Sequence, residues 1–262
     1  MQTKKSLGQH FLNSTKIVSD IVLAGKTKKG DVVLEIGPGE GAMTLALLKT
    51  GAKVIVVEKD DRLIPFLEEK FSKEILSKQL EILHGDVLDQ SVLSKFFIKN
   101  KQYKIIANIP YYITGQIIRT FLETDNQPES MTLLIQKEVA ERIVAKDKKE
   151  SLLSLSIKIY GAPKIMRLVG RGAFRPQPNV DSAVLNIENI SKKNFTGISE
   201  KKFFVLIHAG FAHKRKQLLP NLSDVYKKED LIKAFSACKI DTKSRAEDLS
   251  LETWLNLCKT IC

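Results

Sequence analysis

Short apolar runs alternate with longer stretches of helical periodicity over the first two-thirds of the chain. The runs are rich in Val, Ile and Leu, and each early run ends where polar residues begin. This alternation is typical of β-α units that stack helices on a parallel sheet, so we predict an α/β fold. The predicted strands are 32–36, 53–57, 81–84, 104–107, 132–135, 163–169 and 182–188. No helix-length segment separates the last two strands, so we expect them to form an antiparallel hairpin at one edge.

The pattern changes after Ile190, where a polar connection leads into helical periodicity. Apolar or small residues then recur at the i, i+3, i+4, i+7 and i+8 positions of a helix, namely Phe203, Leu206, Ile207, Gly210 and Phe211. We therefore predict two domains, 1–190 and 191–262, of which the second is small and helical.

The chain is strongly basic, with 42 Lys and Arg against 30 Asp and Glu, a net charge of +12. Residues 191–262 hold 14 Lys and Arg against 8 Asp and Glu, so this quarter of the chain carries +6 of that charge. Such a surface favours a polyanion, and nucleic acid fits best. A membrane is the weaker interpretation, because the chain has no long apolar run and no basic amphipathic helix with a free apolar face. The N-terminus also lacks a secretory signal, so we expect a cytoplasmic protein.

The three cysteines and the histidines give no sign of a metal site. Cys238, Cys258 and Cys262 have no C-x-x-C spacing, and His208 and His213 have no acidic partner at ligand spacing. We predict no metal.

A glycine-rich turn follows the first predicted strand. Gly37 and Gly39 allow the backbone to pass close to a ligand, and Glu58, 21 positions after Gly37, ends the next strand where it can bind ribose hydroxyls. With Ala42 the turn also matches the dinucleotide fingerprint, so a nicotinamide or flavin enzyme remains an alternative here. Glu35 and Gly41 complete E-x-G-x-G-x-G, which resembles the first motif of S-adenosylmethionine methyltransferases. Such an acid near the ligand's sulfonium would be electrostatically favourable.

Asp86 ends the third predicted strand, after a glycine. Its carboxylate could accept a hydrogen bond from the exocyclic amine of a cofactor's adenine. An aspartate at this position could equally cap a turn or the next helix.

The run Asn108-Ile109-Pro110-Tyr111 follows the fourth predicted strand. An adenine N6 amine is a poor nucleophile because its lone pair is delocalised into the ring. The side-chain carbonyl of Asn108 and the backbone carbonyl of Ile109 could accept its N–H groups, while Pro110 holds the turn rigid and Tyr111 stacks on the base. In isolation these residues could merely form a β-turn. After three strands that end in candidate nucleotide contacts, they favour an amine methyltransferase.

Taken together, these motifs resemble the ribosomal RNA adenine dimethyltransferases, in particular the bacterial family that acts on 16S rRNA. The resemblance runs over nearly the whole chain and rests on five segments in order: 6–12, 35–41, 108–111, 134–139 and 174–184. The basic segment 211–217 also resembles the RNA-facing helix of that family.

The resemblance implies a Rossmann-like seven-stranded class I methyltransferase sheet with a small C-terminal helical domain. It implies N6,N6-dimethylation of two adjacent adenosines near the 3′ end of 16S rRNA in the small ribosomal subunit, with S-adenosylmethionine as methyl donor and a role in ribosome assembly. Nothing in the sequence demands more than a monomer.

The resemblance also implies roles for individual residues. The cofactor is expected to contact His10 and Leu12 from an N-terminal arm (1–12), together with Gly37, Glu58, Asp86 and Asn108. Phe174 is expected to sandwich the target adenine against Tyr111. Our candidates for RNA phosphate contacts are Arg171, Arg175, Lys214, Arg215 and Lys216.

The chain departs from the bacterial pattern at two positions, His10 and Tyr112, where members usually have Asn. We expect altered contacts and retained binding. Methylation of a large-subunit adenine is the nearest alternative, because resistance-type enzymes share the arm and the Asn-Ile-Pro-Tyr turn. The other alternative is a non-enzymatic assembly factor that keeps the fold.

Overall fold

A computed structural model of the protein describes residues 10–99 and 102–261. Its contacts divide the chain into two compact units. The sheet unit comprises the chain up to Ala140 together with Ala162–Ile190, and the helical unit comprises Glu141–Gly161 and the chain from Ser191 onward. The predicted boundary after Ile190 coincides with a unit boundary, whereas residues 141–161, which the sequence had placed in the first domain, group with the second.

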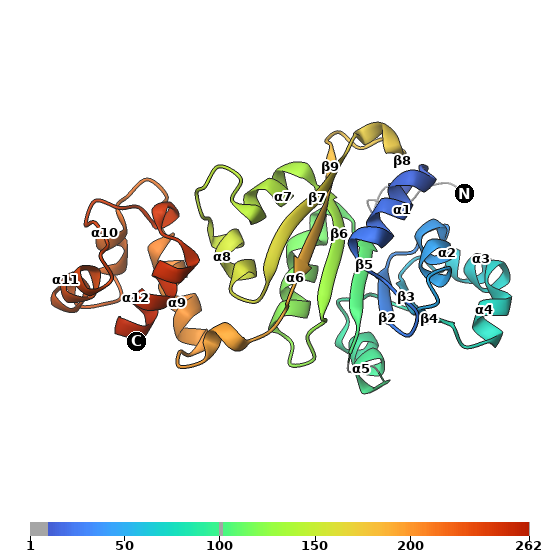
Figure 1. Ribbon diagram of the computed structural model, residues 1–262, viewed down its shortest axis with the longest axis horizontal. Coiled ribbons are helices and arrows are strands. Elements are labelled where there is room, and N and C mark those ends of the chain that lie inside the picture. The colour runs from blue at the N-terminus through green and yellow to red at the C-terminus, as the bar shows by residue number, and fades with distance from the viewer. Residues whose placement is uncertain (1–9, 100–101, 262) are drawn as a thin grey trace. The chain divides into compact units, whose positions relative to one another are not determined.

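The sheet unit is built on one seven-stranded sheet with the order β4-β3-β2-β5-β6-β9-β7 (Figure 1). The first five strands in this order are parallel, and β9 is antiparallel to both β6 and β7. The strands are β2 (Val32–Ile36), β3 (Lys53–Glu58), β4 (Leu80–His84), β5 (Lys104–Asn108), β6 (Ser130–Gln136), β7 (Ala162–Val169) and β9 (Ser182–Glu188). All seven predicted strands and the antiparallel hairpin are thereby confirmed.

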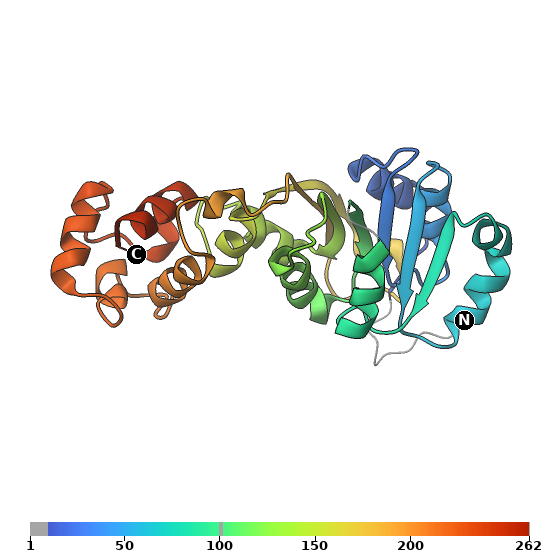
Figure 2. The ribbon, with the colours of Figure 1, turned by 90° about the horizontal axis from the view of Figure 1, so that it is seen from below.

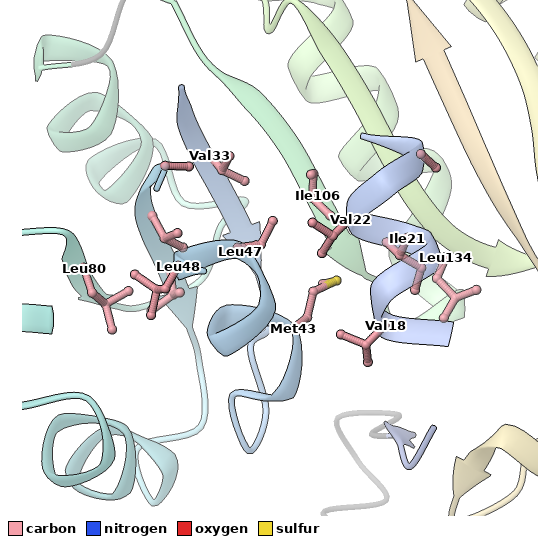
Figure 3. Packing of buried hydrophobic residues seen from close by; sticks show 14 of the residues in the cluster. Val18, Ile21, Val22, Val33, Met43, Leu47, Leu48, Leu80, Ile106 and Leu134 are labelled. Carbon is pink, nitrogen blue, oxygen red and sulfur yellow. The ribbon is translucent and has the colours of Figure 1, made fainter. Parts of the chain in front are cut away.

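One face of the sheet is covered by α1 (Thr15–Ala24) and α2 (Ala42–Leu48). Val18 and Ile21 of α1 and Met43 and Leu47 of α2 interlock over apolar side chains of the sheet such as Val33 (Figure 3). Ser14 caps α1, since its side chain accepts a hydrogen bond from the N–H of Ile17. The edge strand β4 is flanked by α3 (Leu63–Lys70) and α4 (Ser72–Leu76).

The opposite face is covered by α5 (Gln90–Lys99) and α6 (Thr114–Glu123), as Figure 2 shows. Ring contacts between Phe96 and Tyr103 and between Phe97 and Phe121 connect these two helices and the start of β5. Alternate side chains of a strand point to opposite faces, so strands buried on both faces are apolar throughout. This explains why the four inner parallel strands, β2, β3, β5 and β6, consist mostly of apolar residues, whereas the edge strand β4 (Leu80–His84) also carries Glu81 and a final histidine.

Two short strands lie outside the main sheet. β1 (Phe11–Leu12) pairs antiparallel with β8 (Phe174–Arg175), which follows the 3₁₀ turn η3 (Arg171–Ala173). Leu12 and Phe174 are partners in this pair, so residues far apart in sequence hold the end of the N-terminal arm against the sheet unit. Residues 1–9 of the predicted arm lie outside the described residues.

The helical unit consists of α8 (Leu152–Lys158), α9 (Glu200–Gly210), α10 (Leu218–Leu222), α11 (Lys228–Ala237) and α12 (Leu251–Ile261). The helix α7 (Lys137–Val144) runs across the unit boundary, and η4 (Lys193–Phe195) and η5 (Ala246–Asp248) are single 3₁₀ turns.

Aromatic packing explains why residues 141–161 belong to the helical unit. Tyr160 contacts the rings of Phe195 and Phe204, and its hydroxyl donates to the Glu200 carboxylate. A Cβ at Gly210 would lie 2.4 Å from the ring of the fully buried Trp254, so this glycine allows α9 to approach α12 closely. Among the described residues, no helix is long and apolar enough to cross a membrane.

Candidate active site

The sheet unit contains a cavity of about 400 Å³ at the carboxyl ends of β2, β3, β4 and β5. Parallel α/β sheets bind their ligands at this edge, and the volume suits a small organic ligand. The structure brings seven of the predicted site residues together in its lining: His10, Gly37, Glu58, Asp86, Asn108, Pro110 and Tyr111.

The glycine turn forms one wall of the cavity. Gly37 and Gly39 have φ values of +67° and +57°, in the left-handed region that favours glycine. A Cβ at Gly39 would lie 2.8 Å from the ring of Phe11, whereas a Cβ at Gly37 would meet nothing within 4 Å. The absence of a side chain at Gly37 therefore leaves the turn's backbone open to a ligand in the cavity.

Glu58, at the end of β3, is buried with only 5% of its surface exposed. One carboxylate oxygen accepts from the N–H of Asp60 at 2.8 Å, and the other lies 3.4 Å from the N–H of Gly39. Burial raises the pKa of Glu58, although these hydrogen bonds act in the opposite direction. The bonds fix the carboxylate beside the glycine turn, where a ribose is expected.

Asp86 follows β4 and forms an ion pair with Lys59. The Lys59 Nζ donates to Asp86 Oδ2 at 2.8 Å, and Asp86 Oδ1 accepts from the N–H of Leu88 at 2.9 Å. Partial burial alone would raise the pKa of Asp86, but the bonds from Lys59 and Leu88 outweigh it and lower the pKa. Asp86 thus caps a turn, as one interpretation of the sequence predicted, and its ionised carboxylate lines the cavity.

Asn108 ends β5, and its orientation is set by the N-terminal arm. Its side-chain Nδ2 donates to the backbone carbonyl of His10 at 2.9 Å. With Nδ2 used in this way, Oδ1 is the atom that can accept a hydrogen bond from a substrate amine.

Tyr111 lies in the 3₁₀ turn η2 (Tyr111–Ile113), directly after Pro110. Its ring stacks on the imidazole of His10 with 5.8 Å between ring centroids and 23° between planes. Its hydroxyl lies 2.7 Å from the Ser182 hydroxyl, and either group can be the donor. Burial raises the pKa of Tyr111, so the phenol is neutral at physiological pH. Asn108 and Tyr111 therefore place an amide acceptor and an aromatic face in the lining of one cavity.

Glu35 does not line the cavity, whereas the sequence suggested an electrostatic role close to a ligand. It is fully buried at the base of the glycine turn, where its Oε2 accepts from the Thr44 hydroxyl of α2 at 2.7 Å. Burial raises the pKa of Glu35 to about 8. Glu35 therefore connects β2 to α2 beneath the turn.

Two predicted residues lie outside the cavity lining. Phe174 is 3% exposed and Leu12 is partly buried, and both pack with the core cluster beneath α1. Among the described residues, Phe11 contributes to the lining in place of Leu12, and the ring stacked on Tyr111 is that of His10. Pairing of β1 with β8 turns Leu12 and Phe174 toward the core, which explains the difference.

The basic candidates lie on the surface of both units. Arg171 and Arg175 are exposed in the sheet unit, and Lys214, Arg215 and Lys216 are exposed in the helical unit. The last three do not lie on a helix, contrary to the resemblance, because α9 ends at Gly210 and α10 begins at Leu218. They occupy an irregular connection in which the N–H of Lys216 donates to the carbonyl of His213.

Sequence reasoning missed Lys59 and Ser182, which contact Asp86 and Tyr111. Lys59 directly follows the predicted ribose-binding residue Glu58, and this adjacency was an available signal. Ser182 begins a predicted strand, and no local pattern indicated that it would meet a side chain 71 positions earlier.

The lining of the cavity fits S-adenosylmethionine. An open glycine backbone, a fixed carboxylate at Glu58 and an ionised acceptor at Asp86 match a ribose and an adenine amine. Among residues 10–99 and 102–261, no three His, Cys, Asp or Glu side chains form a cluster that could hold a metal ion.

The chain matches a known family over its whole length. A model of the family described as "Ribosomal RNA adenine dimethylase" matches residues 1–262. The chain belongs to this family. Membership confirms the predicted activity, S-adenosylmethionine-dependent dimethylation of adenine in ribosomal RNA, and excludes the nicotinamide oxidoreductase.

The relatives of this dimethylase share nearly its whole length. "Ribosomal RNA small subunit methyltransferase A" of Dehalococcoides mccartyi is 42% identical over 260 residues, which cover 98% of this chain and 88% of the relative. The protein of the same name from Shouchella clausii is 40% identical over 263 residues, covering 97% of this chain and 88% of the relative.

Solved structures confirm the class I methyltransferase fold of the dimethylase. A dimethyladenosine transferase from Plasmodium falciparum superposes with a TM-score of 0.80 at 26% identity, covering 95% of this chain and 96% of that one. The 23S rRNA methyltransferase ErmE superposes with a TM-score of 0.75 at 22% identity, covering 96% of this chain and 99% of that one. At that identity, ErmE supports the fold alone.

Proposed function

We propose that this dimethylase acts on the small ribosomal subunit, where it converts two adjacent adenosines near the 3′ end of 16S rRNA to N6,N6-dimethyladenosine during ribosome assembly. The relatives from D. mccartyi and S. clausii are named for small-subunit rRNA and match almost this entire chain. Their similarity supports the choice of the small over the large subunit.

We assign the binding of S-adenosylmethionine to the lining formed by β2, β3 and β4, the nucleotide end of the cavity. Gly37 leaves room for the ligand beside its backbone, Glu58 accepts from ribose hydroxyls, and Asp86 accepts from the adenine amine. His10 contributes from the arm. The cofactor supplies an electrophilic methyl group, and these residues orient it.

We assign the target adenine to Asn108, Pro110 and Tyr111, the target end of the cavity. Asn108 Oδ1 and the backbone carbonyl of Ile109 accept hydrogen bonds from the N6 amine, which makes the nitrogen more pyramidal and directs its lone pair at the methyl carbon. Tyr111 stacks on the base. No strong base is required, because catalysis comes mainly from positioning.

RNA binding is assigned to basic side chains of both units. Arg171 and Arg175, together with the exposed Lys214, Arg215 and Lys216, contact phosphates, which sets the orientation of the RNA without reading its sequence. Residues 1–190 then serve as the catalytic domain and 191–262 as an RNA-contacting domain. The cytoplasmic protein is expected to act as a monomer and without a metal ion, so chelators should leave its activity unchanged.

The observation that carries the proposal is the hydrogen bond from Asn108 Nδ2 to the His10 carbonyl. It directs the amide so that an acceptor, rather than a donor, is available to the substrate amine. An adenine N6 amine presents two donors, so this orientation matches the proposed substrate.

The test is transfer of a labelled methyl group to unmodified small and large ribosomal particles present in equal amounts. We expect the labelled methyl groups in small-subunit RNA, in an amount that rises in proportion to the amount of enzyme. Label mainly in large-subunit RNA would overturn the subunit assignment, and particle binding without any transfer would favour a non-enzymatic assembly factor.

A further inference from the structure

The hydroxyl of Tyr111 is held by a buried serine from a distant part of the chain. The two hydroxyl oxygens lie 2.7 Å apart, and 71 positions separate the residues in sequence. Ser182 is fully buried, whereas Tyr111 is only partly buried and lines the cavity. The hydrogen bond therefore joins the cavity wall to the interior of the sheet.

Ser182 is rigidly placed. It is the first residue of β9 and pairs with Gln136 of β6 on one side and Val169 of β7 on the other. The preceding residue, Asp181, accepts the N–H of Lys137 at its backbone carbonyl and the N–H of Arg171 at its carboxylate, each at 3.0 Å. Two strands and two further hydrogen bonds thus fix the backbone at Ser182.

Tyr111 itself is less constrained. It lies in a single 3₁₀ turn between Pro110 and α6, and one of the two faces of its ring is covered by His10. Stacking fixes the distance between two rings but permits sliding and rotation. The bond to Ser182 is therefore the directional contact that sets where the ring points.

We propose that Ser182 is a positioning residue for the target base, holding the Tyr111 ring in the plane that presents the adenine amine to Asn108 Oδ1. The inference rests on the proposed stacking of adenine on Tyr111. Small displacements of a reacting group reduce rates strongly, so loss of this bond should lower kcat while the RNA still binds through its phosphate contacts.

Three variants distinguish positioning from a structural role. Tyr111→Phe and Ser182→Ala each remove one hydroxyl and leave the other without its partner, which destabilises the fold. The double variant removes both hydroxyls, so its Tm should recover toward that of the unaltered protein. The ring is unanchored in all three, and a positioning role therefore predicts low kcat in all three, including the double variant.

Tyr103→Phe is the matched control. It removes another buried tyrosine hydroxyl, which donates to the Asn126 carbonyl at 2.8 Å and is remote from the cavity lining. This variant should lower Tm without changing kcat.

The experiment measures kcat and KM on unmodified small ribosomal particles at saturating S-adenosylmethionine, together with Tm. We expect kcat to fall about 10- to 100-fold in both single variants and in the double variant, with KM for the particle unchanged. Unaltered kcat in Tyr111→Phe or Ser182→Ala, or kcat that recovers with Tm in the double variant, would overturn the inference. Tyr111→Ala distinguishes failure of this inference from failure of the proposed function. Full activity in that variant would contradict the stacking of adenine on Tyr111 itself.

Discussion

The two ends of the cavity hold their polar groups by different means. At the nucleotide end, Glu58 and Asp86 are carboxylates fixed by backbone N–H groups and, for Asp86, by Lys59. At the target end, Asn108 and Tyr111 are neutral and are fixed by a backbone carbonyl and a hydroxyl. Carboxylate acceptors suit the binding of a cofactor that must be retained, whereas amide and phenol groups orient an uncharged amine without holding it too tightly.

This difference implies that affinity for the cofactor and the rate of methyl transfer can be altered separately. Changes at the nucleotide end should mainly alter cofactor binding, and changes at the target end should mainly alter the methyl-transfer step. Variants of each end therefore test whether the two ends act separately.

The largest effect is expected for Asn108→Ala at the target end. Removing a preorganised polar contact to a reacting group costs about 100- to 1000-fold in rate, so single-turnover methyl transfer should fall by this factor. Because Asn108 is also an expected cofactor contact, calorimetric titration should show some loss of affinity for S-adenosylhomocysteine, but a much smaller loss than that of the transfer rate. Rapid methyl transfer by this variant would show that Asn108 takes no part in the chemistry.

The next largest effect is expected for Glu58→Ala at the nucleotide end. Hydrogen bonds to charged groups contribute about 1.5–3 kcal/mol, so affinity for S-adenosylhomocysteine should fall about 10- to 100-fold. The rate at saturating cofactor should fall much less. The exposed Glu69→Gln serves as a control, and equal losses of affinity and saturated rate in Glu58→Ala would show that the ends do not act separately.

The contrast between the ends also explains which parts of the site were predictable from the sequence. Gly37, Glu58 and Asp86 each follow a predicted strand, and parallel strands bring their carboxyl ends to one edge of the sheet. Strand patterns predicted the α/β sheet, while the glycine motif, the carboxylates that follow the strands and the family resemblance singled out this group of residues.

The supporting contacts at the target end were beyond sequence patterns. Asn108 meets His10 across 98 positions, and Tyr111 meets Ser182 across 71. No local period encodes such contacts, because they depend on how the arm and β9 pack in three dimensions. The same reason explains Phe174, whose side chain joins the core when β8 pairs with β1.

Tyr111→Ala should have a smaller effect than Asn108→Ala. Stacking of a base on an aromatic ring contributes about 1–3 kcal/mol, which corresponds to a loss of about 5- to 150-fold in kcat/KM for the RNA particle. Cofactor affinity should change little. If steady-state kinetics instead showed a normal kcat/KM for the particle, the base would have to bind elsewhere.

The smallest effect on methyl transfer is expected for Glu35, beneath the glycine turn, whose change acts on stability. Burial holds its pKa near 8 in the folded protein, against 4.5 ordinarily, so the folded state binds an extra proton between these pH values. This contribution to stability is present below pH 4.5 and is lost as pH rises toward 8.

Glu35→Gln should therefore gain stability relative to the unaltered protein as pH rises from 5 to 8, by at most about 1.4 kcal/mol per pH unit. Urea unfolding at several pH values measures this difference, with Glu69→Gln as the control. A difference that does not change with pH would mean that Glu35 is ionised in its buried position.

The central claim, that the target end directs methyl groups to the N6 amine of adenine in small-subunit RNA, is tested most directly by mass spectrometry of nucleosides. Unmodified small ribosomal particles are treated with S-adenosylmethionine and either the unaltered protein or Asn108→Ala, and their RNA is then digested. We predict two N6,N6-dimethyladenosines per particle with the unaltered protein and almost none with the variant. Methyl groups on another base or another adenine atom, or an equal yield from Asn108→Ala, would contradict it.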